Sequence, residues 1–144
     1  MAYSTQADLL ERITEQELIQ LTDDANLGAV DIAKMDAAIA AAAGLLDSYA
    51  GARYPLPLVK TAQVKKLAVD LALYELESRR PPVRETTEKR QEAALRLLRD
   101  VAVGRAELSD QSSAQGASLL EHKAKDHTDT AKQDRFDDEK LKDF

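Results

Sequence analysis

Residues 31–50, DIAKMDAAIAAAAGLLDSYA, contain the most regular apolar pattern of the chain. One set of apolar residues recurs at spacings of 3, 4, 3, 4 and 3: Ile32, Met35, Ile39, Ala42, Leu46 and Tyr49. This is the period of an α-helix with one buried side. Beside that side lie small residues that let another helix approach closely, namely Ala37, Ala38, Ala40, Ala41 and Ala43. Because the repeat is short, the pattern favours a core helix of a small bundle over a coiled coil.

Two short helices are predicted before this segment. Thr5 is followed three residues later by Asp8, and Leu9 begins an apolar side. Residues 14–17, Thr-Glu-Gln-Glu, have the form of a capping box, in which the hydroxyl and the carboxylate each satisfy a free backbone amide. The second short helix is expected to run to about Leu21.

Two longer helices are predicted after it. Prolines in residues 54–58 break the long helix, because proline lacks an amide donor and restricts the residue before it. Thr61 is expected to cap a helix that runs to about Ser78, and two apolar stripes place this helix centrally. A last helix follows Pro81-Pro82 over about residues 83–103. No strand pattern is visible, so the predicted fold is an all-α bundle of about five helices.

The overall composition limits the classes of function. The chain has 144 residues, of which 44% are hydrophobic and 32% charged, and a net charge of −6. The length suggests one domain with an appendage, and the acidic balance argues against duplex DNA or an anionic membrane as the main ligand. There is no cysteine, and the longest apolar stretch, residues 37–46, is far shorter than the roughly 20 residues of a membrane span. With no visible signal peptide, we expect a soluble protein that is cytoplasmic when made.

Candidate sites for metal or phosphate are weak. The loop 23–31 resembles a calcium loop, but Ala25, Leu27 and Lys34 stand where oxygen ligands belong, so a turn with helix-capping acids is favoured. His122 and His127 lack a cluster of further ligands. Three arginines, Arg79, Arg80 and Arg84, bracket the two prolines and form a basic corner. This corner could touch phosphate or the carboxylates of a partner, although a solvated loop is favoured.

No catalytic constellation is visible. The sequence has no Gly-rich phosphate loop, no Gly-x-Ser-x-Gly and no carboxylate pair with an acid–base partner. The short N-terminal helices do not predict a DNA-reading helix-turn-helix, because the following helix offers mainly alanines where base-reading side chains are needed. We therefore expect no enzymatic activity, no metal and no cofactor.

The C-terminal residues 109–144 are predicted to form an extended arm, separate from a helical domain over residues 1–108. The arm is polar and charged, as in chains that are disordered in isolation, yet it holds the only two phenylalanines, Phe136 and Phe144. Asp137 can cap a short terminal helix in which Phe136 and Leu141 form a hydrophobic staple. Such a short helix needs a partner to persist. The arm is therefore expected to dock on another protein.

The order of several segments resembles the Mu-like phage head–tail adaptor family. These segments are residues 3–12, 17–23 and 53–58 (RYPLPL), and the resemblance covers about residues 2–108. Arg135-Phe136, Leu141-Lys142 and Phe144 are also similar to the end of longer family members, whereas residues 111–134 match no known pattern. The predicted partner-binding residues are Arg135, Phe136, Leu141 and Phe144.

The resemblance implies a virion structural protein without catalytic residues. Members of that family form a ring, usually of twelve copies, between the portal and the tail. The implied partners are the portal protein, neighbouring adaptor subunits and a stopper or tail-terminator protein, with genomic DNA as non-specific cargo in the axial channel and no membrane. The implied location is the neck of the virion, after assembly in the cytoplasm of the host bacterium. The alternative is a cytoplasmic helical protein-binding module whose C-terminal tail is a recognition segment.

Overall fold

The computed structural model of the protein describes residues 2–111, which contain five helices and no strand. In chain order the helices are α1 (Gln6–Leu10), α2 (Glu15–Thr22), α3 (Ile32–Ala50), α4 (Ala62–Ser78) and α5 (Glu85–Ala102). The predicted all-α fold with two short and three longer helices is confirmed. The division of the chain into a domain and an arm remains a prediction.

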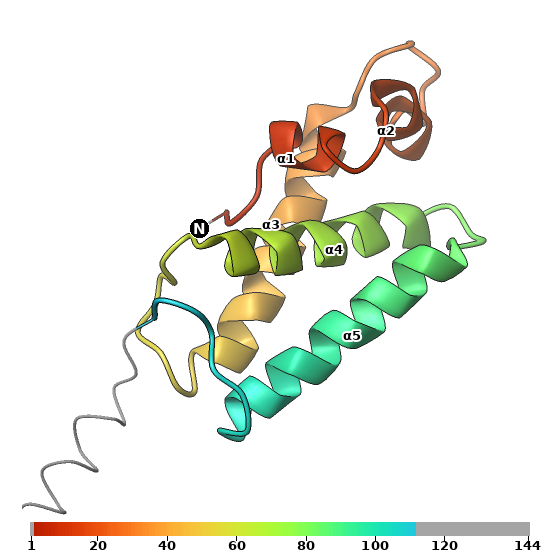
Figure 1. The fold of residues 1–144 in the computed structure, drawn as a ribbon. Coiled ribbons are helices and arrows are strands. Elements are labelled where there is room, and N and C mark those ends of the chain that lie inside the picture. The colour runs from red at the N-terminus through yellow and green to blue at the C-terminus, as the bar shows by residue number, and fades with distance from the viewer. Residues whose placement is uncertain (1, 112–144) are drawn as a thin grey trace, which may run out of the picture. The chain divides into compact units, whose positions relative to one another are not determined.

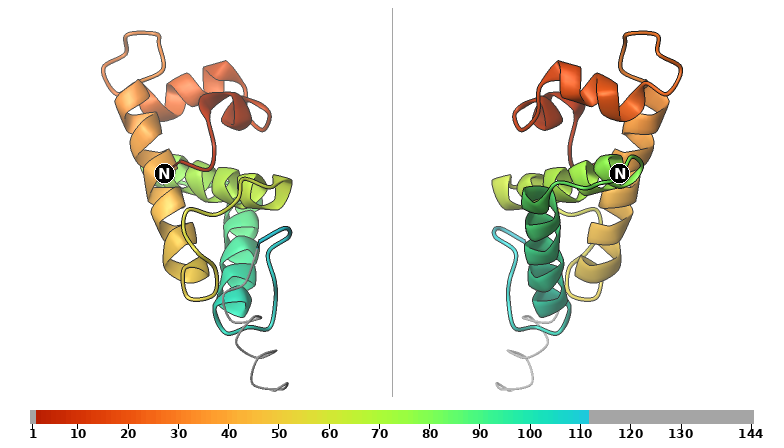
Figure 2. Two further views of the ribbon diagram at one scale, coloured as in Figure 1. Left: turned by 90° about the vertical axis from the view of Figure 1, so that its left-hand side faces the viewer. Right: turned by 90° about the vertical axis from the view of Figure 1, so that its right-hand side faces the viewer.

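Helix α4 lies at the centre of the body. It packs against both α3 and α5, while α1 contacts its N-terminal part, where Asp8 binds Lys65, and α2 contacts both α4 and α3 (Figures 1 and 2). Only Ala62, Lys66 and Ser78 of its 17 residues are exposed. Both predicted apolar stripes are needed, because neighbouring helices cover it from more than one side.

The helix caps predicted within residues 2–111 are present. Thr5 and Thr14 each form a capping box, with Asp8 and Glu17 as the returning carboxylates. The side chains of Asp31 and Thr61 accept hydrogen bonds from the amides of Lys34 and Val64. These four starts were predictable because capping is local to one turn of the chain.

Two details of α3 and α5 differ from expectation. In the α3 seam, Met35, Ile39, Ala42 and Leu46 are buried and Tyr49 is half-buried, but Ile32 is 61% exposed. The first turn of α3 extends past α4 and lies beside α2 (Figures 1 and 2), and Ile32 is on its solvent-exposed side. Helix α5 begins at Glu85 rather than Val83, because Arg84 is extended and its amide donates to the carboxylate of Glu77.

The ends of the described region are fixed by tyrosine hydroxyls. The hydroxyl of Tyr3 donates to Asp47 on α3 and accepts a hydrogen bond of 3.1 Å from the amide of Leu58. The hydroxyl of Tyr54 accepts one of 3.0 Å from the amide of Leu108, which follows α5. The N-terminal segment and the residues after α5 are thus both tied to the ends of the α3–α4 connection.

A matched pair of leucines tests this account of the core. Leu46 is fully buried on α3, so Leu46→Ala should lower the free energy of unfolding by about 2–5 kcal/mol. Leu27 is 81% exposed, so Leu27→Ala should change it by less than about 0.5 kcal/mol. Urea denaturation followed by circular dichroism measures both, and equal losses would contradict the assigned core.

Candidate functional site

The residues predicted to bind a partner lie outside the described part of the chain. Arg135, Phe136, Leu141 and Phe144 all fall in residues 112–144, as do His122 and His127. Their predicted roles therefore stay predictions. The candidate site that the structure does describe is the basic corner between α4 and α5.

Arg79 and Arg80 bind the loop that follows α2. Arg79 Nη2 lies 2.7 Å and Arg80 Nη2 lies 2.6 Å from the two carboxylate oxygens of Asp24. The same guanidinium groups donate to the carbonyl oxygens of Leu21 (3.0 Å) and Gln20 (2.7 Å). The loop is exposed to solvent, as expected, but these two arginines also bind an acid and carbonyl oxygens of their own chain, because α2 and its following loop fold back onto the end of α4.

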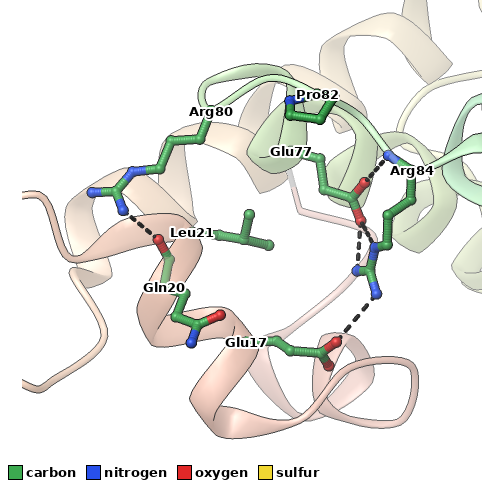
Figure 3. A pocket seen from close by; sticks show the side chains of 7 residues that line it. All are labelled: Glu17, Gln20, Leu21, Glu77, Arg80, Pro82 and Arg84. Atoms are coloured by element: carbon green, nitrogen blue, oxygen red, sulfur yellow. Dashed lines mark hydrogen bonds and ion pairs between the residues drawn. The ribbon is translucent and has the colours of Figure 1, made fainter.

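Arg84 completes the corner through a buried carboxylate. Glu77 is only 3% exposed, and its Oε1 accepts hydrogen bonds from Arg84 Nη2 (2.6 Å), Arg84 Nε (2.9 Å) and the hydroxyl of Thr87 (2.9 Å). Arg84 Nη1 reaches Glu17 on α2 at 3.1 Å. Figure 3 shows Arg84 between the two carboxylates. One guanidinium therefore joins α2, α4 and the start of α5.

These contacts change the titration of the acids. Hydrogen bonds from Lys34, Arg80 and Arg79 hold the pKa of Asp24 well below its ordinary value of 3.8. Burial alone would raise the pKa of Glu77, but the hydrogen bonds from Arg84 and Thr87 outweigh it and lower that pKa below 4.5. Both acids are therefore ionised near neutral pH.

A cavity of about 230 Å³ lies inside this corner (Figure 3). Its lining consists of Glu17, Gln20, Leu21, Glu77, Arg80, Pro82 and Arg84. The lining charges already bind one another or backbone carbonyls of the same chain. The arrangement joins helices and contains neither a nucleophile activated by a base nor a cation left to recognise phosphate.

The loop between α2 and α3 is organised by its own acids. The carboxylate of Asp23 accepts hydrogen bonds from the amides of Leu27 (2.9 Å) and Gly28 (2.7 Å), and Asn26 and Gly28 have left-handed backbone angles. The predicted turn with helix-capping acids is confirmed. Across residues 2–111, no three His, Cys, Asp or Glu side chains are grouped so that they could hold a metal ion.

The outward sides of α3 and α5 differ in charge. On α3 eight residues are exposed, and only Asp36 among them is charged: Ile32, Ala33, Asp36, Ala37, Ala40, Ala41, Gly44 and Ser48. On α5 nine are exposed, and seven of them are charged: Glu85, Thr86, Glu88, Lys89, Arg90, Glu92, Ala93, Arg96 and Arg99. Of the five alanines expected to meet another helix, Ala38 and Ala43 do so within the body, whereas Ala37, Ala40 and Ala41 do not.

The sequence profile of the family described as Bacteriophage Mu, Gp36 matches residues 3–126. The chain belongs to the bacteriophage Mu Gp36 family. The predicted relationship to Mu-like phage proteins is thereby confirmed, and the chain is a phage structural or morphogenesis protein associated with the virion. The match extends beyond Leu108, so part of the segment 111–134 does follow a known pattern.

A search of curated proteins returned no match. Among the helices that the structure describes, none is long and apolar enough to cross a membrane.

Sequence reasoning missed the ion pairs of the Gp36-family chain. The three arginines were visible in the sequence. Two of the acids that they bind, Asp24 and Glu17, lie 55 to 67 positions away from them along the chain. The usable signal was Glu77 itself, an acid within a helix predicted to be buried. A buried carboxylate requires a cation nearby.

Removing the charge of Glu77 tests the corner. Glu77→Gln keeps the volume but weakens the bonds to Arg84 and should lower the free energy of unfolding by about 1–3 kcal/mol. Glu85→Gln is the control, because Glu85 is exposed and pairs only with Lys89, and it should cost less than about 0.5 kcal/mol. If urea denaturation finds the two variants alike, the Glu77 network does not stabilise the fold.

The lowered pKa of Asp24 predicts an acid dependence. The unfolded chain takes up a proton near the ordinary value of 3.8, while the folded protein keeps Asp24 ionised to lower pH. The ion pairs of Asp24 therefore stabilise the fold fully above pH 3.8. This stability is lost as the pH falls below 3.8 and through the lowered pKa of the folded protein. Asp24→Asn should lower stability at pH 7 and give a shallower loss on acidification. Urea denaturation over this pH range measures both slopes, and parallel slopes would contradict the assignment.

Proposed function

We propose that this chain is a head–tail connector, an adaptor that forms a ring in the virion neck between the portal and tail components. Membership of the bacteriophage Mu Gp36 family supports a role in building the particle. The adaptor role rests in addition on the segments that resemble the Mu-like head–tail adaptors. Genomic DNA passes through the axial channel of this ring as non-specific cargo, and the role is not enzymatic.

The outward face of α3 is the observation that carries the proposal. In a chain with 32% charged residues, a long helix whose exposed side has a single charge is suited to contact with protein rather than water. This face is about 28 Å long, given the rise of 1.5 Å per residue. Its alanines and glycine allow a neighbouring helix to approach closely. We assign it to a neighbouring adaptor subunit.

A ring requires that two different surfaces of the subunit meet. When the α3 face of one copy contacts another surface of the next copy, the contact repeats head to tail and closes if the rotation fits. A contact between the α3 faces of two copies would instead use up both faces in a dimer and could not extend into a ring. The ring proposal therefore places the complement of the α3 face elsewhere on the subunit.

In the proposed neck, the arm after residue 108 reaches the portal, a neighbouring subunit or the stopper or tail-terminator protein. Its contacts are assigned to Arg135, Phe136, Leu141 and Phe144. Fully extended, these 36 residues span up to about 120 Å, so their reach does not limit the choice of partner.

Charge insertion tests the α3 face. Ala40→Glu places a carboxylate on this face and should abolish ring assembly and the joining of heads to tails. Ala93→Glu is the matched control, since Ala93 is also an exposed alanine within a long helix but lies among charged residues of α5. Native mass spectrometry and electron microscopy of the necks measure the outcome. Rings that form equally in both variants would remove the α3 face from the proposal.

Deletion of residues 133–144 tests the arm. Particles carrying the shortened chain should fail to join heads and tails, because the assigned contacts are missing. Normal joining would exclude the arm from the mechanism, and absence of the full-length chain from purified necks would favour the cytoplasmic binding module instead.

A further inference from the structure

The segment after α5, residues 104–111, returns to the α3–α4 connection without forming a helix, and we call it the strap. Gly104 starts it with a φ of +81°, a left-handed angle that favours glycine. A Cβ atom at this position would also have to displace the guanidinium of Arg53, the movable end of a flexible side chain. The reversal of the chain after α5 therefore depends on this glycine.

Side chains hold the strap to the body at three points. Leu108 is 3% exposed, and its amide donates to the hydroxyl of Tyr54 at 3.0 Å. The amide and hydroxyl of Ser109 donate to Gln63 Oε1 at 2.8 and 2.9 Å. Gln111 makes the outermost contact, with the backbone of Val59. All three contacts are made with the α3–α4 connection and the start of α4.

The contact of Gln111 replaces a strand pairing. Its Oε1 accepts from the amide of Val59 at 2.9 Å, and its Nε2 donates to the carbonyl oxygen of Val59 at 2.8 Å. A residue of a paired strand would exchange the same two hydrogen bonds through its own backbone. The carboxamide of Gln111 thus forms hydrogen bonds with both the backbone amide and the backbone carbonyl of the exposed Val59.

We propose that the strap is a latch that opens as a unit while the helices stay folded. Leu108 is its single buried large apolar side chain, and the bonds of Ser109 and Gln111 are exposed to water. Segments with few buried contacts open locally at lower free energy than the core. Closed, the latch holds Gln111 against the α3–α4 connection.

Opening the latch would lengthen the arm. Release of the eight residues of the strap adds about 26 Å of extended chain to the 33 residues that follow it, and residues 109–111 are among those already counted in the 36-residue arm. The use of this reach to contact a neck partner rests on the proposed function, whereas the latch itself does not. A failure of ring assembly would therefore contradict the proposed function but not the latch. A strap that never opens separately from the helices would contradict the latch but not the ring.

Gln111→Glu in the full chain gives the decisive test. At pH 7 the ionised Glu still accepts from the Val59 amide but cannot donate to the Val59 carbonyl. Below the ordinary carboxyl pKa of about 4.3, protonation restores a donor and an acceptor. Hydrogen exchange measured by NMR should show the amides of Val59 and Leu108 exchanging about tenfold faster than in the unmodified chain at pH 7. At about pH 3.5 the two amides of the variant should exchange at nearly the same rate as those of the unmodified chain.

Two comparisons complete the test. Gln111→Leu removes both hydrogen bonds. The amides of Val59 and Leu108 should then exchange faster than in the unmodified chain, by the same factor at pH 7 and at pH 3.5. The amide of Leu46 in α3 should exchange at an unchanged rate in every variant, because the helices stay closed. Exchange of Val59 and Leu108 at the rate of Leu46, acceleration of Val59 alone, or no effect of Gln111→Glu at pH 7 would each overturn the latch.

Discussion

The burial of α4 is the constraint on which the rest of the structure depends. A helix with two apolar stripes has to be covered on more than one side, and α3, α5 and the two short helices provide that cover. The same burial encloses two carboxylates, Asp70 and Glu77, which are 5% and 3% exposed. Each needs a cation nearby, and Arg12 and Arg84 supply one at 3.2 and 2.6 Å. The short N-terminal helices and α5 are thus held to α4 by charge as well as by apolar contact.

The polar corner at the end of α4 resembles a binding site in composition but not in arrangement. Three arginines close together usually indicate phosphate or acidic partners. Here each guanidinium already binds acids or carbonyls of the same chain, and the cavity between them is lined by paired charges. The corner fixes the α2–α3 loop and the start of α5, and the contact with a partner is proposed for the outward face of α3 instead.

The described body carries two helix faces of different charge and ends in the strap. The face on α3 has a single charge and the face on α5 is densely charged, so contacts between copies are expected to be directional. Hydrogen bonds hold the strap to the side chains of Tyr54 and Gln63 and to the backbone of Val59.

The amino-acid sequence by itself determined the helices, because their signals are local. The caps at Thr5, Thr14, Asp31 and Thr61 and the apolar period of α3 and α4 each act within a few turns. It also determined which helix is central, since only α4 is apolar on two sides. Tertiary structure alone decided which arginine meets which acid, why Ile32 is exposed and why Gln111 binds Val59. Those pairings join residues distant in the chain, and their distances depend on how the helices pack rather than on any local pattern.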